Sequence, residues 1–80
     1  MVRFFFDFSD GGRATRDVDG HDCESADSAR REVLRALPEI LLHDPRDLDE
    51  REVTCSVRDE CGTVLYRASI TFKGRRSPNG

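Results

Sequence analysis

The segment DVDGHDCE, residues 17–24, gathers the side chains best suited to chemistry in this chain: Asp17, Asp19, His21, Asp22, Cys23 and Glu24, around Gly20. Carboxylate oxygens in such a cluster suit a hard cation such as calcium. However, Gly20 comes too early for an EF-hand loop, and no glutamate lies at the required distance from Asp17. His21 and Cys23 alone would supply at most two ligands of a tetrahedral zinc ion. A polar turn that leads into a helix explains the same residues, so we predict no metal site and no cofactor.

The two histidines are the natural general bases, and the sequence separates them. His21 precedes the predicted helix and His43 follows it, which places them roughly 30 Å apart at 1.5 Å per residue. A nucleophile needs a base within hydrogen-bond reach and a third group to orient that base. The glycine pair Gly11-Gly12 leads into another strand, so no helix N-terminus faces a phosphate there. We therefore predict no catalytic residue, no enzymatic activity and no small-molecule substrate.

The first element that must position these side chains is a strand. In VRFFFDFS one face carries Val2, Phe4, Phe6 and Phe8, and the other carries Arg3, Phe5, Asp7 and Ser9. The following Asp10-Gly11-Gly12 favours a hairpin turn. We expect a weak edge strand over roughly residues 13–18 after it.

A helix is predicted next, with Ser25 as its N-cap. Apolar residues then recur at helical spacing: Ala26, Ala29, Val33, Leu37 and Ile40, widened by Leu34 and Leu41. Pro38 removes the hydrogen bond to the carbonyl of Leu34, which costs about 3 kcal/mol when uncompensated. We therefore expect a kink or a restart, with Pro38 opening a short turn to about Leu42. Residues 43–52, HDPRDLDERE, are predicted to be a polar connection.

The last block, EVTCSVRDECGTVLYRASITF, predicts a second hairpin that turns at Gly62. Val53, Cys55 and Val57 alternate with polar residues on its first strand. On its second strand, Val64, Tyr66, Ala68, Ile70 and Phe72 alternate with Leu65, Arg67, Ser69 and Thr71. The predicted order is therefore ββαββ, an α+β domain with a four-stranded antiparallel sheet and one helix packed on one face. Residues 1–73 form the domain and residues 74–80 are expected to be a disordered tail.

One helix covers one face of such a sheet, so the other face is predicted to be open. Five of its residues form a candidate partner-binding face: Arg3, Phe5, Arg58, Leu65 and Arg67. One interpretation is that Phe5 and Leu65 are ordinary single exposed hydrophobic residues. Another is that they meet a partner, most simply a second copy of this small chain in a homodimer, through this face or an edge strand. A third is an RNA-stacking platform, but that would require more aromatic residues and a basic surround.

Charge and cysteine content limit the class of partner. The net charge of −3 argues against non-specific binding to nucleic acid or anionic membranes. No apolar run is long enough to span a bilayer and no signal peptide precedes the first strand, so no membrane role is expected. Three cysteines without a C-x-x-C motif favour reduced thiols and a cytoplasmic location.

The whole pattern, RFFFDFSDGGR…RDVDG…SARREVLRAL…VRDECGTVLYRASITF, resembles a family of short bacterial proteins catalogued as a domain of unknown function. The positions that carry the resemblance are Asp7, Gly11, Gly12, Asp17, Gly20, Ala29, Val57, Asp59 and Gly62. The resemblance implies a shared fold and no reaction, and Pro38 departs from the uninterrupted helix expected of the family. The layout is more distantly similar to antitoxins of small toxin–antitoxin pairs, but the helix-turn-helix or ribbon-helix-helix segment that reads DNA is missing. A protein-interaction module is our main hypothesis; a nucleic-acid-associated accessory or antitoxin-like protein is the alternative.

Overall fold

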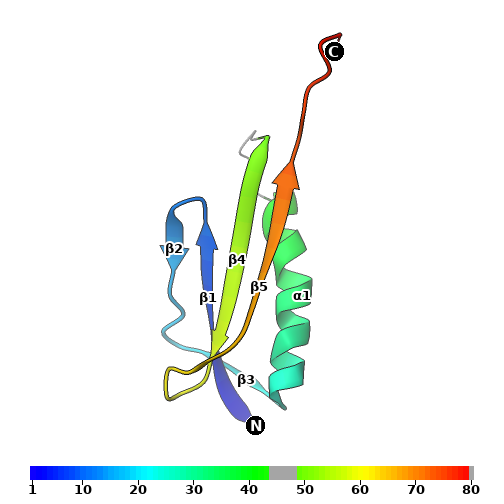
Figure 1. Ribbon diagram of the computed structural model, residues 1–80. Helices are drawn as coiled ribbons and strands as arrows, with labels where there is room; N and C mark the ends of the chain where they lie inside the picture. The colour runs from blue at the N-terminus through cyan, green and yellow to red at the C-terminus, as the bar shows by residue number, and fades with distance from the viewer. Residues whose placement is uncertain (44–48, 80) are drawn as a thin grey trace.

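The computed structural model describes residues 1–43 and 49–79 and shows an α+β architecture, in which one helix packs on an antiparallel sheet (Figure 1). Its elements are β1 (Val2–Asp10), β2 (Arg13–Thr15), β3 (His21–Cys23), α1 (Ala26–His43), β4 (Glu50–Arg58) and β5 (Val64–Lys73). The sheet order is β2-β1-β4-β5, and β3 also pairs with β1. The amide of Gly74, directly after β5, donates to the Asp49 carbonyl at 2.6 Å, and residues 75–79 continue away from the helix and sheet (Figure 1).

The prediction of four strands is wrong, because His21–Cys23 forms a fifth, β3. β2 and β3 share one edge of β1: Phe8 pairs with Thr15, and Val2 pairs with Cys23 further toward the N-terminus. The predicted second strand is also shorter than expected, since β2 ends at Thr15. A strand of three residues offers no alternation to read in a sequence, and β3 exists because the turn before it returns the chain to β1.

The predicted N-cap of the helix is confirmed. The amide of Ser28 donates to Ser25 Oγ at 3.2 Å, and the amide of Ala29 donates to the Ser25 carbonyl at 3.1 Å. The predicted restart at Pro38 is wrong, because α1 continues as one helix to His43. Leu37 is buried and Ile40 and Leu41 pack against the core, so apolar contacts on both sides of the proline hold the helix together. The predicted polar connection includes residues 44–48, which lie outside the described residues.

The core lies between α1 and one face of the sheet, as the alternation predicts. Its buried apolar members are Phe4, Phe6, Cys23, Ala29, Val33, Leu37, Val53, Cys55 and Val57. Phe8, Tyr66, Ala68 and Ile70 pack against them. Arg51 is also buried and holds Asp10, with Nη2 and Oδ2 2.6 Å apart. The ends of the predicted apolar face are less covered, since Val2 and Phe72 are about half exposed.

Candidate functional site

An ion pair between Arg58 and Asp7 organises the sheet face opposite the helix. Nε of Arg58 donates to Asp7 Oδ2 at 2.7 Å, and Nη2 donates to the Asp17 carbonyl at 2.6 Å. The same guanidinium lies over the ring of Phe5, 4.6 Å from its centroid. Both side chains of the pair are largely shielded from solvent, with 12% of Arg58 and 24% of Asp7 exposed. Arg58 therefore acts as an internal tie between β4, β1 and the segment after β2.

Asp17 closes the turn between β2 and β3. Its Oδ1 accepts the amides of Asp19 and Gly20, at 3.2 and 3.0 Å, and its Oδ2 accepts the amide of Phe6 at 3.1 Å. Phe6 lies between the part of β1 that pairs with β2 and the part that pairs with β3. The Asp17 carboxylate therefore accepts the hydrogen bond of the Phe6 amide that a carbonyl of a neighbouring strand would otherwise accept. Gly20 has a φ of +74°, and a Cβ there would lie 2.8 Å from Arg3 Cγ. The segment predicted as a polar turn is thus an ordered turn that is held by hydrogen bonds to Asp17 and packs on β1.

The electrostatics of this network favour ionised carboxylates. Burial raises the pKa of Asp7, but hydrogen bonds from Arg58 and the Asp17 amide, with the positive charge of Arg58, lower it below its ordinary value. Burial acts in the same direction on Asp17, and the amides of Gly20, Phe6 and Asp19 outweigh it, so that pKa is also lowered. The carboxylate oxygens of Asp7 and Asp17 therefore accept hydrogen bonds from groups within the chain. Among the described residues, no group of three or more His, Cys, Asp or Glu side chains is arranged so that it could hold a metal ion.

The structure divides the predicted partner-binding face into residues with different surroundings. Arg3, Phe5 and Arg58 come together around residues 17–20: Arg3 donates to the Asp19 carbonyl at 2.9 Å and to Asp22 at 3.3 Å. Phe5 is half-buried between the Arg58 guanidinium and the backbone of Gly20. Arg67 lies apart from them on β5, where Nε donates to Ser56 Oγ at 3.0 Å. All three arginines already have acceptors within the chain.

Leu65, the fifth residue of that face, is placed on the helix side instead. The ladder between β4 and β5 pairs Val57 with Tyr66 but Arg58 with Val64, so Leu65 is an extra residue at a β-bulge. Leu65 lines a cleft with Asp27 and Arg30 of α1, and Val64 takes the position beside Arg58. The expectation that Leu65 shares a face with Phe5 is therefore corrected. Strict alternation fails there because a bulge reverses the faces beyond it.

The sequence reasoning did not identify Asp7, Asp17 and Gly20 as members of one network. The available signal was a carboxylate within an otherwise aromatic strand, together with the Asp-x-x-Gly spacing of residues 17–20. Asp59 makes a comparable turn, because its Oδ1 accepts the amides of Cys61 and Thr63, both at 2.9 Å. Several positions that carry the family resemblance thus have structural roles in ion pairs and turns.

β5 presents the longest open edge of the sheet. It has ten residues and pairs with β4, and no other strand among the described residues pairs with it. Val64 and Phe72, near its two ends, are 48% and 49% exposed. An unpaired edge offers a row of backbone donors and acceptors to another strand.

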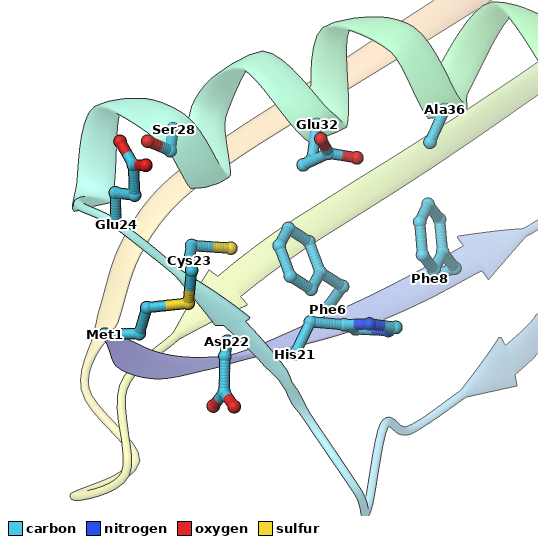
Figure 2. A pocket seen from close by; sticks show the side chains of 10 residues that line it. All are labelled: Met1, Phe6, Phe8, His21, Asp22, Cys23, Glu24, Ser28, Glu32 and Ala36. Atoms are coloured by element: carbon cyan, nitrogen blue, oxygen red, sulfur yellow. The ribbon is translucent and has the colours of Figure 1, made fainter.

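A groove of about 520 Å³ lies on the helix side of β1 (Figure 2). Phe6 and Phe8 stand on β1 and point toward the side of α1 that carries Glu32 and Ala36 (Figure 2). The rings of His21 and Phe6 pack in a T-shaped arrangement, with their centroids 5.5 Å apart. Burial raises the pKa of the Cys23 thiol at one end of the groove, and the charges of Glu32 and Asp22 raise it further. That thiol is therefore held in its protonated, weakly nucleophilic form.

Comparisons with known proteins identify a family. The family described as "Domain of unknown function (DUF6894)" matches residues 3–71. No curated protein and no solved structure matches the chain. Among the described residues, no helix is long and apolar enough to cross a membrane.

Proposed function

We propose, from the premise that the chain belongs to the DUF6894 family, that it is a small protein-interaction module that self-associates through the edge of β5. The observation that supports this proposal is the open edge itself. β5 is ten residues long and makes strand pairs on one side within the described chain. A second copy adding its own β5 in antiparallel fashion would satisfy the outer row of backbone groups and join two sheets into one.

The edge is a better candidate than the open sheet face. Arg58, Phe5 and Arg3 form contacts with one another or with residues 17–22, so these side chains already have partners within the chain. Val64 and Phe72 carry half-exposed apolar side chains at the edge strand, and these would lose solvent contact in a dimer. A chain of 80 residues gains stability from such burial because its own core is small.

The proposal is tested by measuring solution mass with light scattering and sedimentation over a range of concentrations. The wild-type chain is expected to be a dimer, and Val64→Lys with Phe72→Lys is expected to shift it to a monomer because charges blunt an edge. Val18→Lys is the matched control, since Val18 is exposed outside the strands. A monomeric wild type, or a double variant that remains dimeric, contradicts the proposal.

Phe5→Ser separates the edge from the open face. A dimer through the edge keeps its mass in this variant, whereas a dimer through the open face dissociates. We do not extend the proposal to nucleic acid, because Arg3, Arg58 and Arg67 donate to acceptors within the chain. Retention of the folded protein on a nucleic-acid column at moderate salt would instead favour that alternative.

A further inference from the structure

The helix covers only part of its sheet face. α1 packs on β4 and β5 and touches β3, and Figure 1 shows it on the β5 side, with β1 and β2 lying beyond β4. A helix is about 10 Å wide and neighbouring strands are about 4.8 Å apart, so one helix covers about two strands. In the described part of the chain, no second helix covers the sheet beside α1. A groove lies there instead, bordered by Phe8 and one side of α1.

The wall that α1 turns toward the groove is suited to close packing. Ser28, Glu32 and Ala36 are spaced four residues apart and line one side of it. Ser28 and Ala36 are small, which leaves room for another helix at an interaxial distance of about 8–10 Å. Phe8, which is partly exposed, forms the apolar floor on which such a helix would rest, next to the buried Phe6 (Figure 2).

The acidic side chains at the rim of the groove favour an occupant with positive charge. The described lining of the groove includes the carboxylates of Glu24 and Glu32 and contains no lysine or arginine, whereas the Asp22 carboxylate points away from α1 (Figure 2). Glu32 contacts Arg35 at 3.5 Å, and its side chain is still about half exposed. Glu24 and Glu32 therefore give the groove an acidic rim, which attracts positive charge.

We infer that this groove binds an amphipathic, basic α-helical segment of another protein, laid beside α1. Its apolar face would cover Phe8 and the small part of Phe6 that is still exposed, and flanking lysines or arginines would meet Glu24 and Glu32. This is the helix-in-groove mode of recognition, in which apolar anchors recur every three or four residues. The groove is separate from the β5 edge, so this inference stands or falls independently of self-association.

The probe is a synthetic helical peptide with leucines on one face and lysines flanking them, added to isotope-labelled protein and followed by NMR. Amide shifts are expected at Phe6, Phe8, Cys23 and Ala36, and not along β5. Glu32→Lys is expected to weaken the affinity at least tenfold. Glu52→Lys makes the same charge change on an exposed residue of β4 outside the groove lining and is expected to weaken it less than threefold.

Peptide controls test both halves of the recognition. A scrambled peptide without an apolar face, and a version with glutamates replacing lysines, should not bind. Ala36→Phe, which fills the groove with a bulky uncharged side chain, provides a second variant if Glu32→Lys misfolds by circular dichroism. Equal losses in Glu32→Lys and Glu52→Lys, shifts confined to β5, binding of all three peptides, or no binding would each overturn the inference. Groove shifts that depend on protein concentration alone would identify a second copy as the occupant and overturn it too.

Discussion

Arg58 and Asp7 are 51 residues apart in sequence, and the guanidinium and carboxylate meet at 2.7 Å on adjacent strands. The pair also fixes residues 17–20, because Nη2 of Arg58 donates to the Asp17 carbonyl while the Asp17 amide donates to Asp7. Arg58 also lies over the ring of Phe5, so one arginine connects three parts of the chain: β4, β1 and residues 17–20. Two residues of the predicted partner-binding face, Arg58 and Phe5, therefore make contacts that stabilise the fold.

Replacing Arg58 with alanine should destabilise the protein strongly. The substitution leaves the shielded Asp7 carboxylate without its counter-ion, which costs about 2–4 kcal/mol of unfolding free energy. Arg67→Ala removes an exposed arginine of the same sheet and should cost less than about 1 kcal/mol. Urea denaturation measures both. Equal losses in the two variants would show that the ion pair has no special role.

Gly20→Ala should also be destabilising, for a steric reason. Its φ is +74°, and the new methyl group would lie 2.8 Å from Arg3 Cγ and 3.0 Å from Phe5 Cε1. We expect a loss of at least about 2 kcal/mol in unfolding free energy. Gly11→Ala is the control, because Gly11 has a φ of +55° but open space around it. This variant should lose only the unfolding free energy that backbone strain costs, about 1–2 kcal/mol. Thermal unfolding that ranks Gly11→Ala as the worse variant would contradict the packing described for Gly20.

The protein should lose stability in acid as Asp7 and Asp17 become protonated. Their pKa values are lowered in the folded state, so the unfolded chain binds more protons, and stability rises with pH through this range. The contribution is fully present above about pH 5 and is lost as the pH falls below about 4, through the lowered values. The difference in unfolding free energy between wild type and Asp17→Asn should therefore shrink over that range. Asp19→Asn, an exposed change in the same turn, should show a small difference at every pH; a large one would refute the assignment.

Thiol reactivity should distinguish the three cysteines. Cys61 is exposed, whereas Cys23 and Cys55 are buried. Burial, together with the charge of Asp7, raises the pKa of Cys55 to about 11, so its thiolate is scarce at neutral pH. A thiol reagent should modify one cysteine rapidly in the native protein and all three after denaturation. Rapid modification that persists in Cys61→Ser would disprove this pattern.

The residues of the core and the start of the helix could be predicted because their patterns are local. Alternation in β1 identifies Phe4 and Phe6 as buried, and Ser25 caps the helix through atoms three and four residues away. The family resemblance carried the same information, because it consists largely of strand and turn positions. Periodicity reports which side of an element faces the core, and that depends only on backbone geometry.

What the tertiary structure decided is which distant groups meet. The bulge at Leu65 moves one side chain to the other face, and this shift depends on the ladder between β4 and β5. The pairing of Arg58 with Asp7, the fifth strand and the groove left beside α1 likewise follow from strand order and from the width of a helix against a sheet. Local sequence therefore determined the faces of the elements, whereas the positions of partner atoms required the assembled sheet, because contacts across many residues leave no period in the chain.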